Sequence, residues 1–506
     1  MRPGFVHNAL VLVLASLAAV VILVLLLIWN PVASSTEKAE SITVYCAAGI
    51  RKPVEEIAKA YEREYGVQVQ LQYGSSGSLL SQIEVNPTGD LYIPGDDDFI
   101  TPARQKNLVR EMIPLARFSL VLAVAPGNPK NINGIDDLLR EDVKLGIGNE
   151  TTAIGRKTAA LFARTGKAEA LRATVKVVKP TVTEIAADIQ VGAIDAGFIW
   201  DAVAKERQLT IVPLAEAADA EAMIPALVLT SSKQPAAALR FARYLAAPEK
   251  GQQVFAANHY EPLGVEPWAE RPSITLFSGG VNRVAIEQTL AQFVEREGID
   301  LNVVYNGCGT LVGMMKAGQK PDVYFACDVS FTHDVLNLFN AFEDVSSTPM
   351  VMLVRKGNPE NIRTLADLAR PGLRVGRADE QLSALGALTK RLLEAANLYD
   401  AVSANTRVTS PTADFLVNQL NASGQLDVVI VYEANCSYVR DSMEIVPIDH
   451  PLALAVQPIG MGRETRYPLI ATRLIEAVQS DTSRQRFEAA GFSFLHPARP
   501  AETVAP

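Results

Sequence analysis

Residues 67–84, VQVQLQYGSSGSLLSQIE, join a strand to a helix through a turn made of glycine and serine. Val67, Val69 and Leu71 alternate with polar residues, which predicts a strand with one buried face. Glycine lets the backbone approach a ligand closely, and the first turn of a helix has unpaired N–H groups and a partial positive charge. The stretch therefore predicts either an ordinary serine cap or a site for an anion.

The chain contains this pattern twice. Residues 304–318, VYNGCGTLVGMMKAG, repeat the turn 232 residues later, with Cys308 in place of a serine. SITVYCAAG from Ser41 matches SITLFSGGV from Ser273 at the same offset. An offset that stays nearly constant over many blocks predicts a duplicated domain, because a solenoid repeat is far shorter.

The duplication divides the chain into domains. The first domain spans 42–263, the linker 264–272 and the second domain 273–495, with a flexible tail at 496–506. Within each copy, apolar strands alternate with amphipathic helices, as in ITVYCAA at 42–48 and the helix that follows Pro53. This alternation predicts an α/β fold in both domains.

The N-terminus predicts a membrane segment. Residues 9–29 are apolar and uncharged, which is the length of a transmembrane helix and exceeds an ordinary signal-peptide core. We expect an anchor in residues 1–30, with Arg2 on the cytoplasmic side, and a polar tether in 31–41. Cleavage of a signal sequence near residues 30–35 is the alternative. Either way the bulk of the chain lies outside the cytoplasm.

Composition excludes several function classes. The net charge of −9 argues against a nucleic-acid partner. The five histidines are scattered and show no metal-ligand spacing, so no metal site is predicted from them. The PGDDDFI segment at 94–100 lacks the ligand spacing of a calcium loop and predicts a helix cap or a solvated loop.

In the order and spacing of its blocks, the chain resembles the periplasmic molybdate-binding proteins of ABC importers. The matching blocks of the first domain are ITVYCAAG (42–49), YGSSGSLLSQIE (73–84), GDLYIPGDD (89–97), TAIGRKTAALF (152–162) and GFIW (197–200). The resemblance implies a two-lobed periplasmic-binding-protein fold in each domain, each lobe with a mixed sheet flanked by helices. It also implies capture of molybdate or tungstate between the lobes, without a cofactor or catalysis, and delivery to an ABC permease in the membrane.

The resemblance assigns ligand contacts to both domains. Backbone N–H groups and small hydroxyls hold the ion in that family, and its tyrosine falls on Trp200 here. In the first domain the matching positions are Ala48, Gly49, Ser75, Ser76, Ala153, Val182 and Trp200. In the second, more divergent domain they are Val281, Asn282, Cys308, Ala384, Ala413 and Tyr432. Asn282 is expected to replace a lost hydroxyl donor.

The cysteines make the second domain unusual. Cys308 lies in the turn and Cys327 follows the next strand, so the two are expected near each other, and an exported compartment permits a disulfide between them. Buried thiols and a soft-metal thiolate site are the alternatives. The second domain thus either binds an oxyanion, binds a metal through thiolates, or serves as a ligand-free structural domain. Sulfate and phosphate are alternative ligands. We expect no enzyme, because no histidine lies in a matched cleft loop to activate a cysteine.

Overall fold

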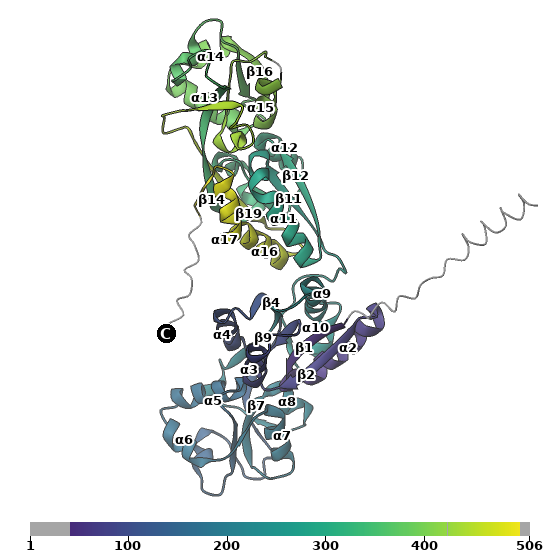
Figure 1. Ribbon diagram of the computed structural model, residues 1–506. Helices are drawn as coiled ribbons and strands as arrows, with labels where there is room; N and C mark the ends of the chain where they lie inside the picture. The colour runs from purple at the N-terminus through teal and green to yellow at the C-terminus, as the bar shows by residue number, and fades with distance from the viewer. Residues whose placement is uncertain (1–40, 423, 496–506) are drawn as a thin grey trace, which may run out of the picture.

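The computed structural model describes residues 41–422 and 424–495. The predicted anchor in 1–30, most of the tether in 31–41 and the tail at 496–506 lie outside the described residues. Within 41–422 and 424–495, no helix has the length and apolarity needed to cross a membrane. Figure 1 shows the two domains end to end, the first at the bottom and the second at the top.

Both domains have the same sheet topology. The strand order is β2-β1-β3-β9-β4-β7-β5-β6 in the first and β12-β11-β13-β19-β14-β17-β15-β16 in the second. The sheets are mixed, since β1 is parallel to β2 and β3 whereas β3 is antiparallel to β9. The predicted tandem duplication of a mixed α/β fold is therefore confirmed.

The strands of the first domain are β1 Ser41–Ala47, β2 Gln68–Gly74, β3 Leu91–Ile93, β4 Val109–Val124, β5 Leu145–Gly148, β6 Val175–Lys179, β7 Ala196–Trp200, β8 Thr210–Val212, β9 Glu221–Leu229 and β10 Glu261–Pro262. Those of the second are β11 Ser273–Gly279, β12 Asp300–Asn306, β13 Val323–Phe325, β14 Phe339–Arg355, β15 Val375–Ala378, β16 Thr406–Ser410, β17 Val428–Tyr432, β18 Met443–Pro447, β19 Leu454–Gly462 and β20 Ser493–Phe494.

The α-helices of the first domain are α2 Arg51–Tyr65, α3 Ser76–Val85, α4 Ile100–Gln105, α5 Ala153–Arg164, α6 Ala168–Thr174, α7 Val182–Gln190, α8 Asp201–Glu206, α9 Pro235–Ala246 and α10 Gly251–Ala257. Those of the second are α11 Arg283–Glu297, α12 Cys308–Lys316, α13 Ala384–Ala395, α14 Tyr399–Asn405, α15 Ala413–Ala422, α16 Pro468–Val478 and α17 Asp481–Ala489. Short 3₁₀ helices include η1 Ala48–Ile50, η2 Asp97–Phe99 and η5 Gly280–Asn282.

One long strand in each domain passes between two lobes. In β4, residues 109–119 pair with β9, whereas residues 120–124 pair with β7. The first part belongs to a lobe built on β1, β2, β3 and β9, which we call the inner lobe, and the second part to an outer lobe built on β5, β6 and β7. β14 does the same in the second domain through β19 and β17. Helices such as α2 bury one face on these sheets: Val54, Ile57 and Tyr61 are fully buried at helical spacing.

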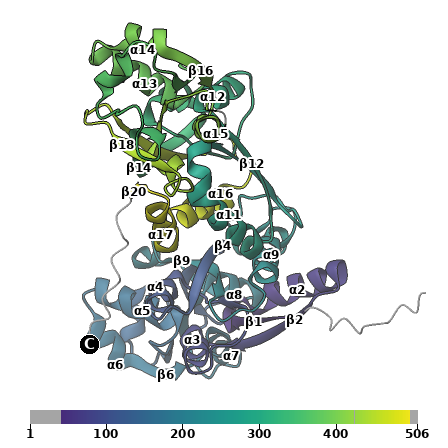
Figure 2. The same ribbon diagram turned by 45° about the horizontal axis from the view of Figure 1, so that its top comes forward.

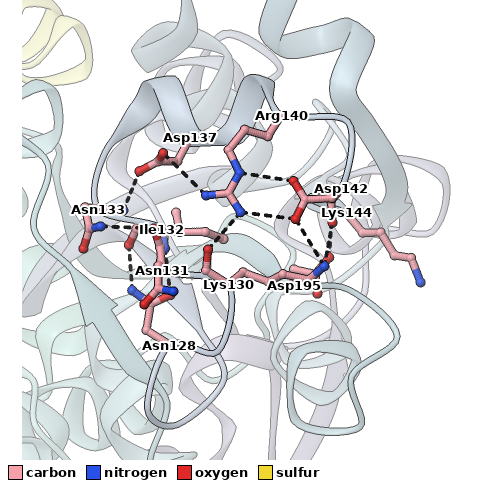
Figure 3. Close-up of polar contacts among 10 residues, drawn as sticks. All are labelled: Asn128, Lys130, Asn131, Ile132, Asn133, Asp137, Arg140, Asp142, Lys144 and Asp195. Carbon is pink, nitrogen blue, oxygen red and sulfur yellow. Dashed lines mark hydrogen bonds and ion pairs between the residues drawn. The ribbon is translucent and has the colours of Figure 1, made fainter.

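The sequence GNP occurs at 127–129 and again at 357–359, and in the first domain it lies in a loop of the outer lobe (Figure 3). Figure 3 shows this loop: Asn128 exchanges two hydrogen bonds with the backbone of Ile132, and Arg140 pairs with Asp142. Asn128 and Asn131 have φ of 49°, a left-handed conformation that asparagine tolerates better than most residues. The motif therefore has a structural role, which explains its presence in both copies.

Buried charges join the two inner lobes. Arg243 of α9, in the first domain, lies 3.5 Å from the carboxylate of Glu297, at the end of α11 in the second. Arg473 of α16 pairs with both oxygens of the same carboxylate, at 2.6 and 2.9 Å. Arg296 also pairs with Glu111 of β4. Figure 2 shows α9, α11 and α16 together at this junction.

Candidate functional site: an uncharged cavity between the lobes of the first domain

A cavity of about 30 Å³ lies between the two lobes of the first domain. Its walls come from both lobes and consist of backbone, small hydroxyl side chains and apolar side chains. The lining residues are Ala47, Ala48, Gly49, Ile50, Gly74, Ser75, Ser76, Gly95, Phe118, Thr152, Ala153, Ile154, Pro180, Thr181, Val182 and Trp200. None of these side chains is charged, so a ligand here interacts with dipoles and hydrogen-bond donors.

Three helices begin at this cavity. α3 starts at Ser76, α5 at Ala153 and α7 at Val182, and all three residues line it. The residue before each start caps its helix by accepting a backbone N–H, for example Thr152 Oγ1 from Gly155 at 3.0 Å. Because a cap satisfies only some of the orphan N–H groups, the first turns retain donors and partial positive charge that face the cavity. Capping and anion binding, which the sequence left as alternatives, are compatible here.

Ser76 is held with its hydroxyl toward the cavity. It is buried, its carbonyl accepts a hydrogen bond from Tyr92 Oη at 2.8 Å, and its Oγ accepts one from the Gly95 N–H at 3.0 Å. A hydroxyl that already accepts a hydrogen bond keeps its own proton to donate. Ser76 is therefore a fixed donor toward whatever the cavity holds.

Gly49 and Trp200 close the cavity from opposite lobes. A Cβ on Gly49 would lie 2.9 Å from Val182 Cγ1, so the absence of a side chain lets the lobes approach. The same Cβ position is 3.7 Å from Trp200 Nε1, which places the indole N–H at the cavity wall. Trp200 is buried and packs on Phe118 with ring centroids 4.1 Å apart, and Tyr260 Oη donates to the Gly49 carbonyl at 2.7 Å.

Asp96 lies directly behind the cavity wall formed by Gly95. As predicted for the PGDDDFI segment, it caps a helix, since its Oδ1 accepts the Asp98 N–H at 2.8 Å. Its other oxygen is 3.4 Å from Lys157 Nζ. Burial, together with a hydrogen bond that the protonated Asp96 carboxyl donates to the Asp97 carboxylate, raises the pKa of Asp96 to about 8, although Lys157 and the Asp98 N–H oppose this shift.

This shift predicts a pH dependence of stability. An unfolded aspartate titrates near pH 3.9, so between about pH 4 and pH 8 the unfolded chain loses a proton that the folded chain keeps. The folded state then loses stability as the pH rises through this window, by up to about 5 kcal/mol, since each unit of a shift of about four units corresponds to about 1.36 kcal/mol. We expect Asp96→Asn to flatten the pH profile of the melting temperature. Asp219→Asn, at an exposed carboxylate elsewhere in the first domain, is the control, and equal profiles for all three proteins would contradict the assignment.

The corresponding positions of the second domain are all buried, namely Val281, Asn282, Cys308, Ala384, Ala413 and Tyr432. The amide nitrogen of Asn282 donates to the carbonyls of Phe325 and Ala326, both at 3.2 Å. Only its carbonyl oxygen has no hydrogen-bond partner among the described residues, and that atom is an acceptor. This arrangement runs against the donor role expected for Asn282.

The two cysteines expected near each other are adjacent. Cys308 and Cys327 are buried thiols with their sulfurs 2.6 Å apart, longer than the bond of about 2.05 Å in a disulfide. The Cys327 N–H donates to Cys308 Sγ at 2.9 Å. Tyr432 occupies the position of Trp200, and its hydroxyl makes no hydrogen bond within the described residues. Burial raises the pKa of Tyr432 well above its ordinary value, so the hydroxyl stays protonated.

The structure brings all seven residues predicted for the first domain to one cavity. Sequence reasoning missed several others, among them Gly95, Phe118, Thr152 and Thr181. The two threonines carried a usable signal, since each is a cap residue directly before a predicted contact. Phe118 carried none, because nothing local distinguishes it from any other apolar residue of a long strand.

Comparisons with known proteins agree with this arrangement. The family model described as bacterial extracellular solute-binding protein matches residues 42–261 and 274–493. A Haemophilus influenzae protein named only as a binding protein is 27% identical over 228 residues, which cover 44% of this chain and 92% of that protein. Molybdate-binding protein ModA of Mycobacterium tuberculosis is 26% identical over 227 residues, which cover 44% of this chain and 84% of that protein.

A solved structure also matches a little under half of this chain. The periplasmic molybdate-binding protein of Azotobacter vinelandii is 20% identical, with a TM-score of 0.39, and the match covers 43% of this chain and 98% of that one. The Haemophilus influenzae and Mycobacterium tuberculosis proteins, each matched over most of their own length, thus correspond to a single domain of the present chain. The chain belongs to the family of bacterial extracellular solute-binding proteins and carries two copies of that family's domain in tandem.

Proposed function

We propose that the first domain captures a tetrahedral oxyanion, molybdate or tungstate, for import by an ABC permease. The observation that carries the proposal is the convergence of the N-termini of α3, α5 and α7 on one uncharged cavity. Such termini stabilise negative charge without a counter-charge. The similarity to molybdate-binding protein ModA of Mycobacterium tuberculosis supports the choice of ion.

The residues that line the cavity support a specific set of ligand contacts. Ser76 Oγ, the indole N–H of Trp200 and backbone N–H groups at Ala48, Gly49, Ala153 and Val182 supply donors, with Ser75 as the cap of α3. An uncharged ring of donors distinguishes oxyanions by size, because it has no strong point charge that would hold any anion in any position. The N-terminal segment, outside the described residues, would keep this domain at the membrane beside its permease.

A titration tests the proposal. We expect molybdate or tungstate, added to the full-length protein in detergent, to raise its melting temperature, since a ligand at 100 times its Kd stabilises the native state by about 2.7 kcal/mol. Sulfate and phosphate serve as comparisons, and a larger shift with either of them would change the assigned ion. If none of the four oxyanions shifts the melting temperature, the transport proposal fails.

A further inference from the structure

The second domain carries a thiol pair at the place where the first domain has its cavity. Cys308 opens α12 as Ser76 opens α3, and Cys327 follows β13 as Gly95 follows β3. The hydrogen bond is also reproduced, since the Cys327 N–H donates to Cys308 Sγ at 2.9 Å as the Gly95 N–H donates to Ser76 Oγ at 3.0 Å. The Cys308 and Cys327 pair therefore occupies the positions that Ser76 and Gly95 have in the first domain.

The side chain of Cys327 fills this space. In the first domain, a Cβ built on Gly95 would lie 3.6 Å from Ala47 Cβ and 3.7 Å from Ser76 Oγ, both of which line the cavity. A side chain at this position therefore points into the cavity. In the second domain, Gly279 stands where the first has Ala47, and a Cβ there would overlap the Cys327 sulfur. The loss of one side chain makes room for the other.

The donors of the second cleft are also occupied. The N–H groups of Gly309 and Thr310, in the first turn of α12, donate to the Leu382 carbonyl at 3.1 and 3.4 Å. Leu382 lies in the outer lobe, so these bonds cross the cleft. The Asn282 amide is likewise bound to backbone carbonyls. A helix N-terminus whose N–H groups already have partners has little to offer an anion.

We propose that Cys308 and Cys327 form a disulfide in the exported protein and that the second cleft, filled by this pair, takes no oxyanion. Each thiol loses one proton and one electron, and a small disulfide such as oxidised glutathione accepts them and becomes two thiols. The sulfurs need to approach by only about 0.5 Å, because a disulfide bond is about 2.05 Å long. Each chain would then bind one ion; this count rests on the function proposed for the first domain.

Peptide mapping of the native full-length protein, isolated from its exported compartment, tests the disulfide. Trypsin cuts after Lys316, between the two cysteines, and separates peptides 297–316 and 317–355. After alkylation under denaturing conditions without reductant, we expect these peptides to be linked and two hydrogens lighter than their sum. Cys46 and Cys436, which are also buried, should be alkylated in the same sample. Alkylation of all four cysteines without reductant would overturn the disulfide.

Binding measurements test the filled cavity. By calorimetry with molybdate we expect one equivalent per chain, and two equivalents would overturn the proposal. Gly95→Cys, which puts the second domain's residue into the first cavity with ordinary contact distances, should weaken binding more than 100-fold and change the melting temperature little. Retained binding in this variant would also overturn it, with Gly95→Ala as the smaller control. If the native protein binds no ion, the function proposed for the first domain fails, and peptide mapping still decides the disulfide.

Discussion

Ser76→Ala is expected to weaken oxyanion binding by about 10- to 100-fold, because a hydrogen bond to a charged group contributes about 1.5–3 kcal/mol. The Ser76 hydroxyl accepts from the Gly95 N–H and so presents its proton to the cavity. Alanine removes this donor and also leaves the Gly95 N–H without its partner. Calorimetric titration with molybdate measures the loss directly.

Ser81→Ala is the matched control for this change. Ser81 lies on the same helix, α3, but is exposed to solvent. We expect it to bind molybdate with the affinity of the native protein. If Ser76→Ala and Ser81→Ala bind equally well, Ser76 is not a ligand donor and the cavity assignment loses its best-defined side-chain contact.

Glu297→Ala is expected to destabilise the protein by about 3–5 kcal/mol, since removing one partner of a buried ion pair leaves uncompensated charge. The carboxylate of Glu297 is 2% exposed and faces two guanidinium groups, from Arg243 and Arg473. Burial lowers the pKa of Arg243 to about 10, a sign that the site is poorly solvated. Chemical denaturation of the full-length protein, followed by far-UV circular dichroism, measures the loss.

Two further variants separate charge from packing at this junction. Glu295→Ala, at an exposed position of the same helix, should change stability by less than about 0.5 kcal/mol. Glu297→Gln keeps the shape and some of the hydrogen bonds but removes the charge, so its effect should fall between the two. Equal stability of Glu297→Ala and Glu295→Ala would show that the ion network does not hold the domains together.

Much of the fold was predictable because local patterns and global architecture agree. Alternating apolar residues at Val67, Val69 and Leu71, followed by a capped helix, specify strand, turn and helix without tertiary information. The constant offset between copies then predicts two equivalent domains, and the sheet orders are indeed identical. The crossing of β4 between lobes was not predicted, since a long strand that changes partners has the same local pattern as one that does not.

The cavity was predictable only in part. Ser76, Ala153 and Val182 each follow a cap residue, so each carries a local sign of a helix start. Asn282 shows what the residue type alone cannot predict. An asparagine amide can donate to a ligand, but here it donates to the backbone carbonyls of Phe325 and Ala326 instead. The exchange between Gly279 and Cys327 joins positions 48 residues apart, and only coordinates show that the two compete for one volume.

The Arg243, Glu297 and Arg473 network also has a mechanical consequence. It fastens one inner lobe to the other, whereas the outer lobes, with α5 to α7 at one end and α13 to α15 at the other, take no part in it. A rotation of either outer lobe about β4 or β14 would therefore leave these ion pairs between the two inner lobes in place. A transporter that binds both inner lobes would thus meet them at the same separation, whatever the orientation of either outer lobe.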